Sequence, residues 1–386
     1  HSTHRRYRSA PLLTPSPDPI SESAAALRVM VPKLPSRTFL EPYLDRIDRV
    51  QHYTNFGPLN SELEARYAAR LGLPDNCVAT VGNATLGLTL ALAAVGAPRG
   101  SLCIMPAWTF IATPLAAMAA GLVPYFVDVD QESWGLHPDT MRAAIAAAPG
   151  RVGAIMPVLP FGRPLPVGAW DEVSEREGIP VIIDAAAAVD SLTPIRSISV
   201  VSLHATKLLG AGEGGFVAST DAAMVSRFRC LSAYGFQGTR MSQLPGTNAK
   251  MSEYHAAVGL ASLDRWRDMR QDYMNLALAY SEALSASNCA RLQPGFGHAW
   301  LAGTCIAQLD DEQVDAVAAR LTAANIETRQ WWERGAHSHP ATSHLPRGNL
   351  ATTDRLSRST IGLPFHLNLK RADIERVVDV MRMAVS

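Results

Sequence analysis

The sequence lacks an excess of charge of either sign. It carries 35 Lys and Arg residues against 35 Asp and Glu residues in a chain of 386, so its formal net charge is zero. Proteins that bind nucleic acid or anionic membranes through bulk charge usually have a basic excess. The sequence therefore gives no support for nucleic acid or a membrane surface as a partner.

Cysteine and long apolar runs are also scarce. The five cysteines are far apart and none forms a CxxC pair, which argues against a disulfide framework and against a zinc site. No uninterrupted apolar stretch is long enough to cross a bilayer. The basic segment from His1 to Ala10 has no apolar region behind it, so we expect no secretory signal there. We expect a cytoplasmic protein that holds no metal.

The length and composition favour two folded domains. The chain is 47% hydrophobic and 18% charged, which is ordinary for a folded protein, but 386 residues are too many for one average core. Six prolines fall between residues 11 and 35, and we interpret residues 1–35 as a poorly ordered N-terminal arm. We place a large domain at residues 36–245 and a small domain at residues 246–386.

Short apolar runs alternate with helical stretches through the large domain. The expected strands are Cys77–Val81, Leu102–Met105, Val123–Val129, Val152–Leu159, Pro180–Ile183, Ile198–Leu203 and Gly215–Ala218. This alternation predicts an α/β fold with a mostly parallel, seven-stranded sheet between helices. The remainder is largely helical with one strand candidate, Trp300–Gln308, and predicts a smaller α+β domain.

Ligands of open α/β sheets bind beyond the carboxyl ends of the strands, so we expect the functional residues there. The first candidate is the turn Gly82–Gly87, where backbone N–H groups and the Thr85 hydroxyl could form a phosphate cradle. Small residues at such a turn can also be turn chemistry alone. This segment by itself leaves both readings open.

Asp184 and Lys207 follow two further strands. Asp184 after Ile182-Ile183 is either a helix N-cap or a buried carboxylate that keeps a ring nitrogen protonated. Lys207, between Ser202-Leu203-His204 and a glycine-rich turn, is either a solvated loop lysine or an amine that forms an imine. A phosphate turn, an acid and then a lysine, each after another strand, is the order of a fold-type-I pyridoxal 5'-phosphate (PLP) enzyme.

The run SLHATKLLGAGEGGF resembles the lysine motif of the DegT/DnrJ/StrS family of PLP-dependent sugar aminotransferases. NATLGLTLAL resembles the phosphate turn of that family, MPAWTFIAT its Pro-x-x-Thr-aromatic segment, and NAKMSEYHAAVGLASLD the segment that opens its second domain. The similarity runs from about Asn55 to the C-terminus, and its middle is the most specific part.

The resemblance implies a role for each matching residue. Lys207 would form the Schiff base with PLP, and Asp184 would pair with the pyridine nitrogen. Phe110 would stack on the ring, while Ala84, Thr85 and Ser202 would hold the phosphate. Asn248 would reach the phosphate in the neighbouring subunit, which implies a homodimer with shared active sites.

Three positions depart from the family pattern. Ala187 replaces a usual Gln or His beside the cofactor ring, so water, substrate or a neighbouring group must fill that place. Lys250 replaces a common Arg, and Tyr234 stands where a His is typical. These changes leave the cofactor prediction intact and put the substrate in question.

The resemblance implies transfer of an amino group from an amino acid, with glutamate as the expected donor, through the pyridoxamine 5'-phosphate form to a nucleotide-linked 3- or 4-keto sugar. Candidate substrate contacts are His204, Tyr234, Arg240, Lys250, Arg329, Trp331, Trp332 and His337. The paired tryptophans could equally pack a core or a subunit interface. A cyclitol or other carbocyclic ketone is an alternative acceptor. A sugar dehydratase or a regulatory protein is an alternative function, although a family dehydratase would replace Lys207.

Overall fold

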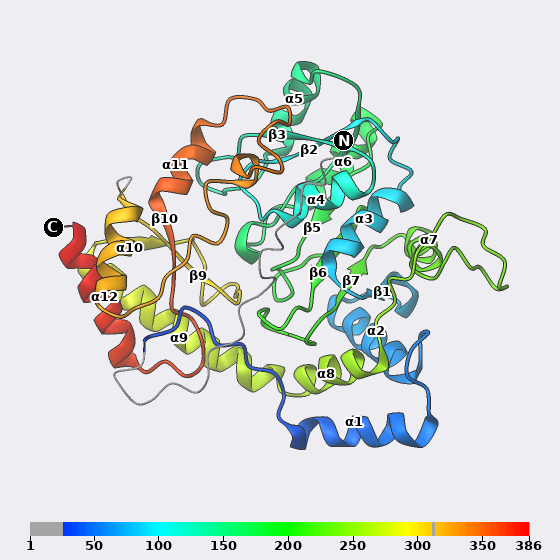
Figure 1. Cartoon of the computed structure of the whole chain (residues 1–386), viewed down its shortest axis with the longest axis horizontal. Helices are drawn as coiled ribbons and strands as arrows, with labels where there is room; N and C mark the ends of the chain where they lie inside the picture. Colours follow the sequence, from blue (N-terminus) through cyan, green and yellow to red (C-terminus); the bar gives the residue numbers. More distant parts are fainter. Residues whose placement is uncertain (1–25, 311–312, 386) are drawn as a thin grey trace, which may run out of the picture.

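Seven strands of the first 220 residues form one sheet at the centre of the computed structural model, which describes residues 26–310 and 313–385 (Figure 1). The strands are β1 (Val78–Val81), β2 (Leu102–Pro106), β3 (Val123–Val127), β4 (Val152–Ile155), β5 (Ile182–Asp184), β6 (Ile198–Ser202) and β7 (Gly215–Ala218). Two ladders, β3-β2-β4 and β5-β6-β7-β1, are joined by parallel bridges from Ile155 to Val181 and from Val158 to Asp184. All seven predicted strands are confirmed.

Strand β7 is the one member of this sheet that runs against its neighbours. It is antiparallel to both β6 and β1, whereas β2, β3 and β4 are parallel to one another and β5 is parallel to β6. The chain returns from β6 to β7 through the glycine-rich turn after Lys207 without a crossover helix, and a direct return of this kind gives antiparallel strands. Because the other six strands run in the same direction, the predicted mostly parallel sheet is confirmed.

Each face of the sheet has its own apolar core. Phe216 of β7 and Val201 of β6 pack in one core. Their neighbours along the same strands, Val217 and Val200, pack in the other. Successive side chains of a strand point to opposite faces, so a sheet buried on both faces needs apolar residues throughout. The surrounding helices are α2 (Pro58–Leu71), α3 (Ala84–Ala94), α4 (Ala112–Ala119), α5 (Met141–Ala147), α6 (Gly168–Glu177) and α7 (Ala222–Ser232).

A second, smaller sheet follows in the chain. Strands β8 (Arg291–Leu292), β9 (Cys305–Gln308) and β10 (Thr360–Leu363) are antiparallel in the order β10-β9-β8. The long helix α9 (Trp266–Ser287) packs beside α12 (Arg371–Val385), which also contacts α10 (Val314–Ala323). Helix α11 (Ala351–Ser359) leads into β10, as Figure 1 shows.

The expected N-terminal arm lies mainly outside the described residues, which begin at residue 26. The last part of that arm follows a defined course, contrary to our expectation of poor order up to residue 35. Leu27 pairs with Ile326, and the Val29 N–H donates to the Glu327 carboxylate at 3.1 Å. The start of the described chain therefore packs on the smaller, C-terminal unit.

Helix α1 (Arg37–Val50) was not predicted, and it contains Pro42, a residue that disfavours a helix interior. It packs on α8 (Glu253–Asp264), which also packs on α2 (Figure 1). Helix α8 thus lies with the large sheet although our boundary at residue 246 gives it to the small domain. We now propose that the boundary falls near Arg265, between α8 and α9.

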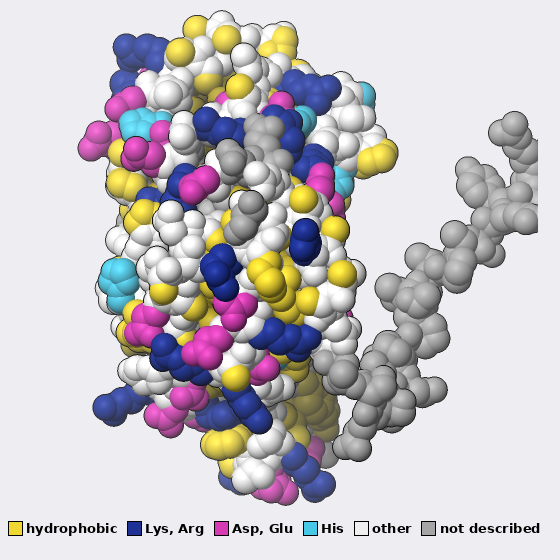
Figure 2. Space-filling model, turned by 90° about the vertical axis from the view of Figure 1, so that its left-hand side faces the viewer, with side chains coloured by type: hydrophobic (Ala, Val, Ile, Leu, Met, Phe, Trp, Pro, Cys, Tyr) yellow, Lys and Arg dark blue, Asp and Glu magenta, His cyan; other side chains and the backbone are white. Residues whose placement is uncertain are grey.

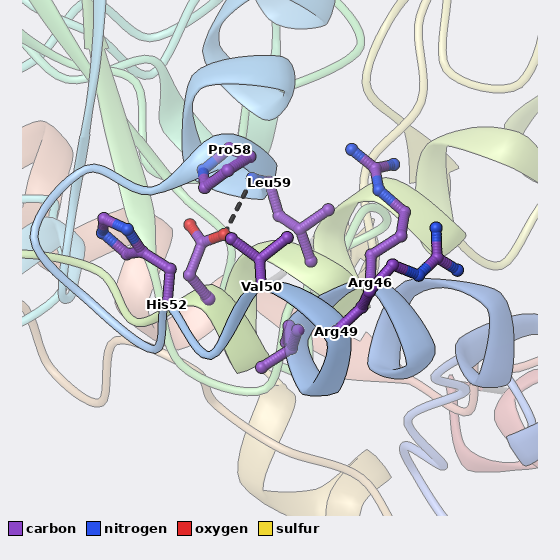
Figure 3. Close-up of a pocket in the computed structure, with 8 residues that line it drawn as sticks. Arg46, Arg49, Val50, His52, Pro58 and Leu59 are labelled. Atoms are coloured by element: carbon purple, nitrogen blue, oxygen red, sulfur yellow. Dashed lines mark hydrogen bonds between the residues drawn. The ribbon is translucent and has the colours of Figure 1, made fainter.

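A cavity of about 220 Å³ opens where α1 meets the start of α2, and Figure 3 shows the residues around it. Arg46, Arg49 and His52 line its rim. The Glu253 carboxylate reaches in from α8 and accepts the backbone N–H groups of Leu59 and Asn60, each at 2.8 Å. The first N–H groups of a helix lack carbonyl partners within it, so Glu253 satisfies the start of α2.

Charges of both signs are mixed on the face formed by the C-terminal unit, where Figure 2 shows basic and acidic side chains interspersed. Within residues 26–310 and 313–385, no helix combines the length and apolar character needed to cross a bilayer. The five cysteines are all buried and carry free thiols.

Candidate active site

Asp184 and Lys207 meet at the carboxyl end of the large sheet. Asp184 is the last residue of β5, and Lys207 follows its parallel neighbour β6. Burial raises the pKa of the Asp184 carboxyl above its ordinary value, and the charge of Lys207 opposes the rise. Burial lowers the pKa of the Lys207 amine, and the charge of Asp184 opposes that fall. The structure thus brings the two predicted residues within range of each other's charge.

The Asp184 carboxylate is held inside the protein, with a relative exposure of 5% for the residue. Its Oδ2 accepts the Thr113 hydroxyl at 2.8 Å, and its Oδ1 accepts the Ala186 N–H at 3.1 Å. Residues 185–197 contain turns and irregular chain but no helix, so Asp184 is not the N-cap of a helix. Of our two readings, the structure supports the buried carboxylate.

Backbone N–H groups converge at the start of α3. The Asn83 side chain caps this helix by accepting the Leu86 N–H at 2.9 Å, so the earlier N–H groups of Ala84 and Thr85 stay free for a ligand. Gly215 pairs with Ser202 across β6 and β7, and a Cβ atom at Gly215 would lie 3.1 Å from the Ala84 nitrogen. The lack of a side chain there leaves a cradle that suits a phosphate group.

Phe110 follows β2 in the chain, just before α4 begins at Ala112. The exposed fraction of its side chain is 53%, which is high for an aromatic residue that follows a buried strand. A flat, exposed ring at this edge of the sheet can stack on a heterocycle. The described residues therefore offer an amine, a carboxylate, a phosphate cradle and a ring surface, a set that fits PLP.

The loop that carries Lys207 is braced from two sides. The Lys207 N–H donates to the His204 carbonyl at 2.8 Å, and His204 Nδ1 lies 2.8 Å from the Thr206 hydroxyl. Gly303, from the C-terminal unit, approaches so closely that a Cβ atom there would lie 2.8 Å from the Thr206 carbonyl oxygen. His204 thus stabilises the loop through contacts with Thr206 and Lys207. Its Nε2 also lies 3.7 Å from the Glu213 carboxylate.

Four predicted ligand contacts lie on the segment after α7, and three of them touch. The Lys250 ammonium lies 2.5 Å from Asn248 Oδ1 and 4.7 Å from the centre of the Tyr234 ring. Arg240 is exposed on the same segment. Within the part of the chain that the structure describes, no hydrogen bond or ion pair joins these residues to Lys207 or Asp184.

Trp331 and Trp332 belong to an aromatic cluster, and two further predicted substrate residues, Arg329 and His337, lie on the same segment. Trp332 is buried against Phe161 and contacts Trp108 edge-on, with ring centroids 5.3 Å apart. Arg329 lies 4.8 Å from the centre of the Trp331 ring. His337 is buried, with Nε2 3.7 Å from Asp354. For Trp332 the structure shows core packing, the alternative that we had kept open.

Sequence reasoning missed two hydroxyl groups behind Asp184. Thr113 contacts the carboxylate directly, and Thr109 Oγ1 lies 2.7 Å from Thr113 Oγ1. Their spacing of four residues places both on one side of a helical turn. Two threonines at this spacing in the otherwise apolar segment Ala107–Ala117 were the available signal.

The fold and this constellation define a PLP-dependent aminotransferase of fold type I. A model of the DegT/DnrJ/EryC1/StrS aminotransferase family matches residues 37–382, and the chain belongs to that family.

Similar proteins cover nearly the whole chain. Protein Rv3402c of Mycobacterium tuberculosis is 30% identical over 92% of this chain and 89% of its own. The dTDP-3-amino-3,4,6-trideoxy-alpha-D-glucose transaminase of Streptomyces venezuelae is 29% identical over 84% of this chain and 87% of its own. The crystal structure of DesI in the presence of its TDP-sugar product is 32% identical, covers 95% of this chain and 94% of DesI, and has a TM-score of 0.84.

Proposed function

We propose that this aminotransferase moves an amino group from an amino acid, with glutamate as the expected donor, to the keto carbon of a nucleotide-linked sugar. The observation that carries the proposal is the meeting of Lys207, Asp184 and the start of α3 at one edge of the sheet. The likeness to DesI and to a dTDP-sugar transaminase supports the acceptor class.

Bound PLP supplies an aldehyde carbon and an electron-withdrawing ring. The N–H groups of Ala84 and Thr85, with the Ser202 hydroxyl, would hold its phosphate. Asp184 would keep the ring nitrogen protonated, and Phe110 would cover one ring face. Together these groups would fix the ring so that its aldehyde carbon lies within reach of Lys207.

Lys207 has the two properties that the reaction needs. Its lowered pKa increases the fraction of neutral amine, which is the form that attacks an aldehyde carbon. After the donor displaces it, the free amine would take the proton from the donor's α-carbon and deliver it to the C4′ position. In the second half it would move a proton in the opposite direction onto the acceptor's amine-bearing carbon.

We further propose a homodimer in which Asn248 reaches the phosphate in the partner's site. Asn248 and Tyr234 are exposed on the segment after α7, and the partly buried Lys250 contacts both. A cationic and aromatic group of this kind suits a nucleoside diphosphate as well as a cofactor phosphate. The roles of His204, Tyr234, Arg240, Lys250, Trp331 and His337 in substrate binding remain predictions.

Two half-reactions test the proposal. Excess glutamate should bleach the yellow colour of the purified protein as the pyridoxamine form accumulates. That form should then recover its colour with a keto-sugar nucleotide from a panel that varies the base and the keto position. A Lys207→Ala variant should show neither change, while the exposed Lys370→Ala variant should behave as wild type.

The panel should also include carbocyclic ketones. Amination of a cyclitol ketone with no turnover of any sugar nucleotide would replace the proposed acceptor with the carbocyclic alternative. A yellow protein that ignores every amino donor would overturn transamination and favour a sugar dehydratase or a regulatory role.

A further inference from the structure

Two buried hydroxyl groups stand in line behind the Asp184 carboxylate. Thr113 Oγ1 lies 2.8 Å from Asp184 Oδ2, and Thr109 Oγ1 lies 2.7 Å from Thr113 Oγ1. Thr109 and Thr113 are each only 1% exposed. Two polar side chains therefore occupy a buried site, where apolar side chains would pack without needing a hydrogen-bond partner.

The number of available protons determines which group donates in each of these two hydrogen bonds. A threonine hydroxyl has one hydrogen to donate, and an ionised carboxylate has none. With Asp184 ionised, Thr113 must donate to Oδ2, and Thr109 must then donate to Thr113. Successive hydrogen bonds in one direction polarise each other, so both hydroxyl dipoles point their positive ends toward the carboxylate.

The same short segment also places Phe110. Thr109 and Thr113 turn inward to Asp184, whereas Phe110 between them turns outward and is half exposed. The Thr113 N–H donates to the Phe110 carbonyl at 3.2 Å, which ties the two functions to one turn of backbone. The Phe110 ring, which would face the cofactor, and the Thr113 hydroxyl, which holds Asp184, are thus positioned by the same short segment.

We infer that Thr113, backed by Thr109, is a positioning residue that holds Asp184 ionised and turns its carboxylate toward the ring nitrogen of the cofactor. This inference rests on the cofactor role that the proposed function gives to Asp184. Burial alone raises the pKa of this carboxyl, and the Thr113 hydroxyl is the first of the groups that oppose the rise. The other two are the Ala186 N–H and the charge of Lys207.

Threonine-to-valine substitution tests the inference with almost no change in side-chain shape. The Thr113→Val variant removes the hydroxyl, Thr113→Ser keeps it, and Thr109→Val removes only the second member of the line. Thr342→Val is the matched control, because Thr342 is another fully buried threonine, and its hydroxyl donates to the Ala336 backbone carbonyl and not to Asp184.

The primary readout is the ¹⁵N chemical shift of the ring nitrogen in protein loaded with ¹⁵N-labelled PLP, since this shift reports whether the nitrogen is protonated. Thr113→Val should move the shift toward the unprotonated value and weaken PLP binding by about ten- to a hundredfold, the range for a lost bond to a charged group. Thr113→Ser should restore both values. Thr109→Val should move both in the same direction by less, and Thr342→Val should move neither.

A wild-type ring-nitrogen shift and PLP affinity in Thr113→Val would overturn the inference, whatever its activity. If Thr113→Val does not fold, a wild-type ring-nitrogen shift in Thr109→Val would overturn the inference instead. Neither readout needs an acceptor, so failure of the whole sugar panel would count against the proposed function and leave this inference intact.

Discussion

Trp332 lies flat against Phe161, with ring centroids 3.7 Å apart and ring planes 14° from parallel. Both rings are buried, and they connect the C-terminal unit with the turn after β4. Trp332→Ala should therefore lower the free energy of unfolding by about 3–5 kcal/mol, the cost of truncating a buried aromatic residue. Urea denaturation measures this change, and Trp332→Phe should recover much of it.

This variant also separates our two readings of the paired tryptophans. A core role predicts lower stability with an acceptor KM close to wild type at temperatures where the variant is folded. Unchanged stability together with a raised KM would identify Trp332 as a substrate contact instead.

Replacing Lys207 by alanine should abolish covalent attachment of PLP. Borohydride reduction followed by mass spectrometry of tryptic peptides should find the cofactor on Lys207 in wild type and on no peptide of the variant. Activity should fall by at least about 10²- to 10⁴-fold, because the residue that moves protons is lost as well. Labelling of another lysine in wild-type protein would contradict the assignment.

Asp184→Asn should make the apoprotein more stable at neutral pH while it damages function. The folded-state pKa of Asp184 is raised above the ordinary value of 3.8, so the buried, ionised carboxylate opposes folding at higher pH. That cost is absent below pH 3.8, where the side chain is protonated in both states, and is complete above the folded-state pKa. The amide avoids it at every pH.

The measurement is a pair of denaturation curves, for wild type and Asp184→Asn, across pH 4 to 8. The advantage of the variant should shrink as the pH falls toward 3.8. With PLP bound, turnover by the variant should fall by at least about a hundredfold, because an amide cannot stabilise charge on the ring nitrogen. An advantage that does not change with pH would show that the ionised carboxylate is not its cause.

Asn248→Ala should release PLP faster than wild type although the residue lies outside the cradle of its own chain. The expected cause is loss of a phosphate contact made across the proposed dimer. Dialysis followed by absorbance gives the dissociation rate, and Asn275→Ala, at an exposed position on α9, serves as the control. Full activity in a protein that sediments as a monomer would contradict the shared-site proposal.

Glu253→Ala should destabilise the start of α2. The change leaves the buried N–H groups of Leu59 and Asn60 without acceptors and should cost about 2–4 kcal/mol of unfolding free energy. Glu253→Gln keeps one acceptor oxygen and should cost less. Hydrogen exchange at the Leu59 and Asn60 amides locates the effect, and slow exchange in Glu253→Ala would show that another group caps the helix.

Local pattern predicted the sheet and the cofactor residues but not the elements that depend on contacts across the chain. All seven strands of the large sheet and the close approach of Asp184 to Lys207 follow from buried apolar runs with chemistry at their ends. Helix α1 was missed because its stability comes from packing on α8, some 200 residues away, and Pro42 argues against it locally. Thr113 was missed because its partner lies 71 residues away.

Gly303 has a consequence for how the enzyme could be divided or rebuilt. A methyl group at this position would collide with the carbonyl of Thr206, the residue before Lys207. The C-terminal unit therefore forms part of the wall behind the reactive amine. A fragment that ends before residue 300 would keep Lys207, Asp184 and the start of α3 and still lack that wall. Chimaeras meant to change the acceptor should accordingly exchange loops around an intact pair of units and should not exchange whole C-terminal halves between relatives.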